Sequence, residues 1–178
     1  EQRKAELEYQ MLMRQVAGFH GYGVHRQLHP NRVLRIAGLG RGAADSRKSY
    51  VPPPPTAAVV HLVDAESTAS ASLDYFIENE LAKEYPGTMF MRSGGRSVIL
   101  MDSELAQKSF PKNVLDPDKD MPALLAIRDG VVINACPGLL GLAFDGEIEP
   151  RAVRQWLDRS RVLLTETPAH DMCFIRPE

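Results

Sequence analysis

An apolar stretch that begins with a proline constrains the fold more than any other feature of this chain: Met121-Pro122-Ala123-Leu124-Leu125-Ala126-Ile127. It ends at Arg128-Asp129-Gly130, and a second apolar run, Val131-Val132-Ile133, follows. Two apolar runs joined by a turn that contains Asp-Gly predict a β-hairpin. Because proline has no N–H for the sheet, Pro122 is expected at the first position of its strand, and the bond before it is a candidate for the cis form. We therefore interpret Pro122 as a fold-defining residue.

Hydrophobic patterns elsewhere predict a sheet covered by helices. The continuous apolar run at 57–63 is typical of a strand that is buried on both faces. Apolar side chains recur at helical spacing over 73–85, after a cap that we place at Ser70 or Ser72. Further expected elements are a short strand or helical turn at 33–39, a strand at 88–92, a short strand or buried turn at 98–101, a short helix at 103–109 and a last helix near Pro150.

The chain is expected to hold one folded domain with extensions. Its 178 residues, 44% of them hydrophobic, can bury one sizeable core. We place a helix and an extended arm at 1–55, the domain at 56–165 and a tail at 166–178. A net charge of -2 gives no reason to expect nucleic acid or an anionic membrane as a partner, and no apolar run approaches the roughly 20 residues of a membrane span. We therefore expect protein partners and a cytoplasmic location, with the cilium as the alternative.

The histidine and cysteine patterns predict no metal, cofactor or redox centre. His61 interrupts the buried strand, and a single histidine there is more often a satisfied core residue than a ligand, because metal sites need several converging ligands. Cys136 and Cys173 form no C-x-x-C and no metal-spaced set. Cys136 follows a strand and precedes a proline, which suits a packed thiol better than an activated one. A non-enzymatic protein is therefore expected, and a monothiol enzyme that uses Cys136 is the disfavoured alternative.

The predicted order of strand, helix, strand, connecting helix, hairpin and final helix resembles the thioredoxin fold. In that fold the loop after the first central strand carries a C-x-x-C at a helix N-terminus, where the thiol becomes a nucleophilic thiolate. Here that loop is 64–70, and it contains no cysteine. We therefore expect an α/β chain with a thioredoxin-like mixed sheet flanked by helices and an N-terminal helical extension, without dithiol chemistry.

Several short sequence segments between residues 20 and 165 also resemble the phosducin-like family. They are Gly21-Tyr22-Gly23-Val24, Val59-Val60-His61-Leu62, Leu81-Ala82-Lys83-Glu84-Tyr85-Pro86 with Met89-Phe90, Met121-Pro122-Ala123-Leu124-Leu125 with Asp129-Gly130, Trp156-Leu157 and Val162-Leu163-Leu164. The resemblance implies a redox-inactive adaptor that binds the cytosolic chaperonin and its clients, as a co-chaperone, or regulates G-protein βγ dimers, which are β-propellers. A thioredoxin-like structural subunit of a larger assembly, such as a ciliary or organellar complex, is the alternative, because arms with little core of their own order against a partner.

Three candidate protein-binding surfaces follow from the sequence. For the last of them core packing is the alternative, because large apolar side chains are usually buried. The three are Leu7, Met11 and Arg14 on the first helix, Asp64, Glu66 and Ser67 in the loop that lacks cysteine, and Leu139, Leu142 and Phe144, with Leu140, after the hairpin.

Overall fold

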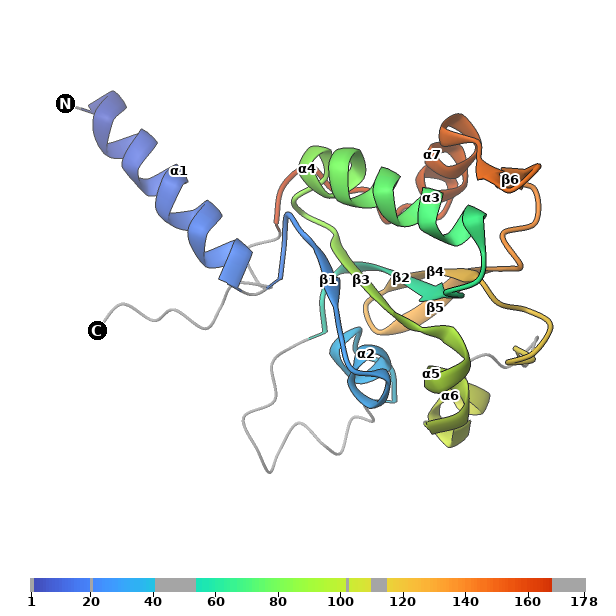
Figure 1. Cartoon of the computed structure of the whole chain (residues 1–178). Coiled ribbons are helices and arrows are strands. Elements are labelled where there is room, and N and C mark those ends of the chain that lie inside the picture. Colours follow the sequence, from blue (N-terminus) through green and yellow to red (C-terminus); the bar gives the residue numbers. More distant parts are fainter. Residues whose placement is uncertain (1, 20, 41–53, 102, 110–114, 168–178) are drawn as a thin grey trace.

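The computed structural model describes residues 2–19, 21–40, 54–101, 103–109 and 115–167 (Figure 1). At its centre is a five-stranded sheet with the strand order β1-β3-β2-β4-β5. β3 runs parallel to β1 and β2, whereas β4 is antiparallel to β2 and β5. This order and these directions are those of the thioredoxin fold, so the predicted fold class is confirmed. The strands are β1 (His25–Gln27), β2 (Ala57–Val63), β3 (Met89–Gly94), β4 (Ala123–Arg128) and β5 (Val131–Pro137).

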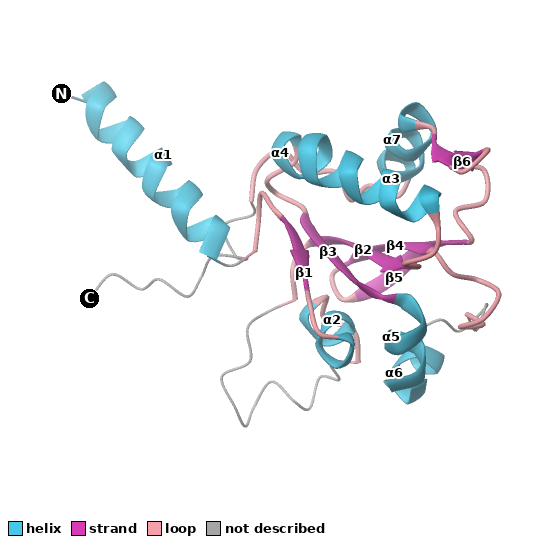
Figure 2. Cartoon of the chain, in the orientation of Figure 1, coloured by secondary structure: helices cyan, strands magenta, loops and turns pink. Residues whose placement is uncertain are grey.

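Helices cover both faces of the sheet, as Figure 2 shows. On one face, α3 (Thr68–Phe76) continues through a π-helical turn, η2 (Ile77–Leu81), into α4 (Ala82–Glu84), and α7 (Pro150–Arg159) lies beside them. The other face carries α2 (Pro30–Ile36), α5 (Gly95–Met101) and α6 (Ser103–Ser109). A separate small hairpin, β6 (Ala143–Phe144) with β7 (Glu147–Ile148), precedes α7.

The central strand β2 contributes to two apolar layers. Successive strand residues point to opposite faces, so Val60 belongs to the apolar cluster with α2 and α5, and Val59 belongs to the cluster with α3 and α7. His61 has the parity of Val59 and therefore points toward α3. The first six residues of β2 are buried, which confirms the prediction of a strand covered on both faces.

The predicted hairpin is present, with Pro122 directly before its first strand. The Met121–Pro122 bond is cis, and β4 begins at the next residue. Asp129 and Gly130 form the turn, with positive φ angles of 49° and 76°. A Cβ atom on Gly130 would lie 2.7 Å from the carbonyl oxygen of Gly38. The turn therefore requires glycine for two reasons, its backbone conformation and the close approach of a neighbouring loop.

The substitution Gly130→Ala should destabilise the protein more than the substitution Gly141→Ala. Both glycines have positive φ, but a Cβ on Gly141 meets nothing within 4 Å. Each substitution should cost about 1 kcal/mol from backbone strain, and Gly130→Ala should cost at least about 1 kcal/mol more because of the clash. Urea unfolding of the full chain measures both free energies of unfolding. Equal losses in the two variants would show that the Gly38 approach does not constrain the turn.

The folded domain begins earlier than the predicted boundary at residue 56. β1 pairs with β3, and α2 buries Val33 and Leu34 in the core, although both elements lie in the segment that we assigned to an extended arm. The strand has three residues and the helix has seven. β1 consists of three polar residues, so no hydrophobic alternation marks it as a strand. α2 overlaps the short strand or helical turn that we expected at 33–39, and it packs into the domain.

Two further predictions on the α-helices need correction, and one is confirmed. Residues 98–101 lie in the helix α5 rather than in a strand or turn. The cap of α3 is Ser67, whose side chain accepts from the N–H of Ser70, rather than Ser70 or Ser72. The predicted short helix at 103–109 is α6.

The N-terminal helix α1 (Gln2–Phe19) extends away from the domain in Figure 1. Its apolar side chains Leu7, Tyr9, Met11 and Leu12 are all exposed. Exposed apolar side chains add no packing energy to a helix, and an isolated helix of this length is only marginally stable in water. Within the described part of the chain, no helix combines the length and apolar character that crossing a bilayer requires.

Candidate functional site

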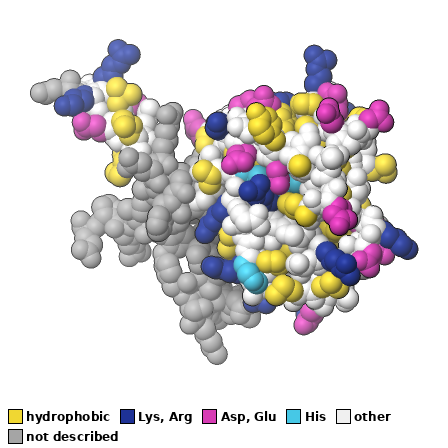
Figure 3. Space-filling model, in the orientation of Figure 1, with side chains coloured by type: hydrophobic (Ala, Val, Ile, Leu, Met, Phe, Trp, Pro, Cys, Tyr) yellow, Lys and Arg dark blue, Asp and Glu magenta, His cyan; other side chains and the backbone are white. Residues whose placement is uncertain are grey.

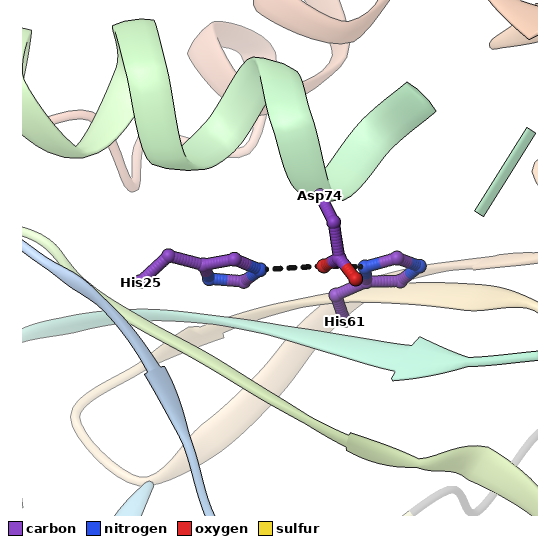
Figure 4. Close-up of side chains that lie close together, drawn as sticks. All are labelled: His25, His61 and Asp74. Atoms are coloured by element: carbon purple, nitrogen blue, oxygen red, sulfur yellow. Dashed lines mark hydrogen bonds and ion pairs between the residues drawn. The ribbon is translucent and has the colours of Figure 1, made fainter. Parts of the chain in front are cut away.

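A buried polar cluster lies between α3 and the sheet (Figure 4). The Oδ1 atom of Asp74, on α3, lies 2.7 Å from His25 Nε2 and 2.7 Å from His61 Nδ1. The other carboxylate oxygen, Oδ2, lies 3.2 Å from Nη1 of Arg92. His25 comes from β1, His61 from β2 and Arg92 from β3. One carboxylate therefore joins three neighbouring strands to the helix above them.

Strand register brings these side chains to one face of the sheet. His25 pairs with Phe90, and His61 pairs with Arg92, across the two parallel ladders. Phe90 and Arg92 are two residues apart in β3, so they point to the same face. Asp74 follows Ser70 by one helical turn, on the side of α3 that faces the sheet.

Ser70 extends the cluster on the far side of His61. Its Oγ lies 3.0 Å from His61 Nε2 and accepts a hydrogen bond from the backbone N–H of Asp64. Ser70, His61 and Asp74 are thus connected in the order of a nucleophile, a base and an orienting carboxylate. Ser70 and His61 are completely buried, however, and a nucleophile must be reached by its substrate. We therefore assign this chain of hydrogen bonds a structural role.

Charge in the cluster is governed by opposing effects of burial and hydrogen bonding. Burial by itself raises the pKa of Asp74, but the hydrogen bonds from His25 and His61 outweigh it and hold that pKa well below its usual range. Burial lowers the pKa of His25, and the hydrogen bond with Asp74 offsets only part of that effect. At neutral pH the cluster therefore contains an ionised carboxylate and a neutral His25.

Stability should fall on mild acidification, and His25 should contribute to that fall. Because the pKa of His25 is lower in the folded state than its ordinary 6.5, the unfolded chain binds a proton first as the pH falls below that value. The contribution of neutral His25 to the free energy of unfolding is therefore fully present above pH 6.5. It is lost as the pH falls from 6.5 toward the pKa of His25 in the folded state, at up to about 1.4 kcal/mol per pH unit. His25→Gln should lose less stability than the wild type between pH 7 and pH 5, as measured by urea unfolding with a chelator present.

The exposed histidine His29 provides the control for this experiment. His29→Gln should keep the wild-type dependence on pH, because its side chain lies at the surface, at the start of α2. If the stability of the wild type and that of His25→Gln depended on pH in the same way, the lowered pKa of His25 in the folded protein would be contradicted.

The loop from Asp64 to Ser70 occupies the place where thioredoxins carry their thiols, and here its polar groups serve the backbone. Asp64 Oδ1 accepts from the N–H of Glu66, and Ser67 caps α3. Glu66 is exposed, whereas Asp64 and Ser67 are partly buried. This candidate surface is therefore accessible mainly through Glu66 and its exposed neighbours Ala65 and Thr68.

Cys136 lies on β5 and is buried. Burial raises the pKa of its thiol to about 11, and the thiol donates to the carbonyl oxygen of Leu140 at 3.3 Å. A thiol with such a pKa contains almost no thiolate at neutral pH, and the thiolate is the reactive form. Cys173 falls outside the described residues.

Cys136 should react slowly with thiol reagents in the folded protein. In a Cys173→Ser background at pH 7.5, a disulfide reagent such as DTNB should modify native Cys136 at least about 100-fold more slowly than the urea-unfolded chain, because so little thiolate is present. Rapid modification of the native protein, together with insulin reduction that Cys136→Ser abolishes, would instead support a monothiol enzyme.

The remaining predicted surface residues divide between surface and core. Leu139 and Leu142 are buried in the apolar cluster that includes residues of α3 and α7. For these two residues the surface prediction is wrong and the core-packing alternative is correct. Phe144 and its neighbour Leu140 are exposed, by 62% and 86% respectively. Leu7 and Met11 are exposed on α1; Arg14 lies in the same helix, and its side chain falls outside the described part of the chain.

Sequence reasoning expected a hydrogen-bonded core residue at His61, and it missed the partners. His61 is buried and bonded to Asp74 and Ser70, as predicted for a satisfied core histidine. Asp74 lies within the predicted helix, and no role was predicted for it. Its placement one turn after Ser70, between apolar positions that face the sheet, was the available signal. His25 and Arg92 gave no signal, because their approach depends on the pairing of β1 with β3.

No protein-family model matches the chain, and no curated protein matches it. Among solved structures, the oxidised thioredoxin from Plasmodium falciparum is similar over 58% of this chain and 80% of that chain, with 12% sequence identity and a TM-score of 0.39. The assignment of the thioredoxin-like fold rests on the strand order and directions described above.

Proposed function

We propose that this chain is a redox-inactive adaptor of the phosducin-like type, which uses its thioredoxin-like domain to bind other proteins. The observation that carries the proposal is the loop Asp64–Ser70, which occupies the redox position of the fold without a cysteine and uses its polar groups for capping. The buried, protonated thiol of Cys136 offers no substitute. The described part of the domain thus keeps the scaffold without a thiol at the redox position, which supports a docking role.

Contacts between the sequence segments that resemble the phosducin-like family support this proposal. Thr88 directly precedes Met89-Phe90, and its hydroxyl donates to the carbonyl oxygen of Val162 and accepts from the N–H of Leu164. The N–H of Gly87 also donates to the Leu164 carbonyl oxygen. The segment at the end of α4 and the segment after α7 therefore lie side by side, although about 75 residues separate them in the chain. The presence of both family-like segments in this chain is explained if the two segments together stabilise one structural unit of the family.

The domain offers an exposed apolar surface beside the loop that lacks cysteine. Phe144 lies in β6 of the small β6–β7 hairpin, and Leu140 lies just before that hairpin. The N–H of Ile148 in this hairpin donates to Ser72 Oγ at 3.5 Å. Gly146, at its turn, approaches Thr68 so closely that a Cβ would lie 2.6 Å from the hydroxyl oxygen. The hairpin is therefore held against the start of α3, next to Glu66. We call Glu66, Leu140 and Phe144 the loop-end surface.

The proposed partners are the cytosolic chaperonin, its clients and the β-propeller of G-protein βγ, which the phosducin-like resemblance implies. Two surfaces are available for them: the loop-end surface and the apolar side of α1, with Leu7 and Met11. Large exposed apolar side chains with polar groups around them are typical of protein-binding sites. The adaptor proposal therefore assigns one contact to the domain and one to the helix.

Binding of the full chain to purified cytosolic chaperonin and to purified G-protein βγ tests the proposal. At least one should bind, and Leu140→Asp with Phe144→Asp should weaken the interaction at least about 10-fold, since truncated apolar anchors at an interface commonly cost more than 1 kcal/mol. Leu7→Asp with Met11→Asp tests the helix in the same assay. Leu100→Asp is the matched control, because Leu100 is exposed on α5, on the other face of the sheet.

Failure to retain either partner at low salt would overturn the adaptor proposal. The alternative, a fixed subunit of a larger assembly, is favoured by the exposed apolar side chains Leu7, Tyr9, Met11 and Leu12 of α1, which such an assembly would bury. Sedimentation of the native protein from cells distinguishes the two: an adaptor exchanges between free and bound forms, whereas a subunit stays in one stoichiometric complex.

A further inference from the structure

We propose that His25, His61 and Asp74 form a binding site for a zinc-class transition-metal dication between α3 and the sheet. The three candidate ligand atoms, His25 Nε2, His61 Nδ1 and Asp74 Oδ1, lie within 4.8 Å of one another. They come from β1, β2 and α3, so residues far apart in sequence converge on one point. The site is independent of the loop-end surface and of the proposed adaptor function.

The ligand set is of the kind that zinc uses. Three protein ligands, histidine nitrogens and a carboxylate oxygen among them, leave a fourth position for water in open zinc sites. In Figure 4 both imidazole rings direct a nitrogen toward the Asp74 carboxylate, from opposite sides. Each nitrogen is 2.7 Å from Oδ1. An ion that replaces the two shared protons, with tetrahedral bonds of about 2.0–2.2 Å, needs ligand atoms about 3.3–3.6 Å apart. Each nitrogen must therefore move away from Oδ1 by roughly 0.6–0.9 Å, which requires rotation of the side chains.

Both histidines have a second nitrogen that can hold the displaced proton. If His61 carries its proton on Nε2, it can donate to Ser70 Oγ, which lies 3.0 Å away. Nδ1 of His25 is buried and has no hydrogen-bond partner among the described residues, so it is free to take the proton of that ring. Each ring can thus present a lone pair to the ion. Ser70 would be the outer-shell partner that orients His61, as is common at metal sites.

Charge and burial favour a borderline metal over a hard cation. Asp74 is ionised at neutral pH, and Arg92 contacts only its Oδ2, which leaves Oδ1 for the ion. Arg92 nevertheless opposes a dication, so ligand bonds must supply most of the affinity. Imidazole binds zinc well, whereas magnesium and calcium prefer sites made of oxygen ligands. The edge of the cluster reaches the surface, because the Asp74 side chain is 16% exposed and that of Arg92 is 29% exposed. Figure 3 shows basic and acidic side chains next to each other on this side of the molecule, with little histidine surface between them.

The ion would secure the weakest strand of the sheet. β1 has only three residues, pairs with β3 alone, and is followed by the helix α2. Ligation of His25 would tie this edge strand to β2 and α3 at once. Metal binding would therefore stabilise the attachment of the N-terminal segment to the domain.

Zinc titration of the metal-stripped full chain tests the site. Competition with a chromophoric chelator at pH 7.5 should give one zinc per chain, and zinc should raise the Tm. His25→Gln and Asp74→Asn should each weaken zinc binding at least about 10-fold and reduce the rise in Tm, because each removes a ligand. His29→Gln, at the exposed histidine, should bind zinc as the wild type does. Cobalt substitution should give visible d–d absorption in the wild type and not in the two ligand variants.

The proposal is overturned if the wild type binds no stoichiometric zinc, or if the ligand variants bind zinc as tightly as the wild type does. Far-UV circular dichroism of the metal-free proteins controls for folding. If Asp74→Asn does not fold, His25→Gln decides the question, because His25 lies on the edge strand and its loss leaves the central sheet intact. Binding of chaperonin or G-protein βγ is measured separately, so failure of one proposal does not imply failure of the other.

Discussion

The ionised carboxylate of Asp74 is the interaction on which the upper half of the structure depends. It accepts from His25 and His61 at 2.7 Å and pairs with Arg92 at 3.2 Å, so it connects α3 with β1, β2 and β3. Buried polar groups are costly unless they are hydrogen-bonded. Polar residues at matching positions of helix and sheet therefore also impose a register between the two layers, which apolar packing alone specifies less strictly.

The same cluster lies close to the part of the fold where a thioredoxin would perform its chemistry. Ser70 links the cluster to the loop Asp64–Ser70, because its Oγ contacts both His61 and the backbone of Asp64. A loop that is held by capping and by a buried network is suited to present a fixed surface. This is consistent with the proposed use of the domain for docking, and with the exposed Leu140 and Phe144 on the neighbouring hairpin.

The sequence predicted most of the domain because its signals are local. The apolar run of β2, the helical spacing of α3 and α4, and the hairpin around Pro122 each appear within a short window. β1 was missed because its three residues, His25–Gln27, are all polar. α5 was misassigned because it follows β3 without a break, and α2 was predicted only as a short strand or helical turn at 33–39. Leu139 and Leu142 looked like surface candidates in a loop, but the loop folds back under α3 and α7 and buries both.

By itself the sequence determined the thioredoxin-like class, the absence of a cysteine at the redox position and the presence of a satisfied histidine in the central strand. These properties depend on residue type and on spacing along the chain. Tertiary structure alone decided that His25, His61, Asp74 and Arg92 meet. Their approach depends on the parallel pairing of β1 and β2 with β3 and on the seating of α3 over that face. Contacts between residues 25, 61, 74 and 92 are non-local, and no period in a single sequence encodes them.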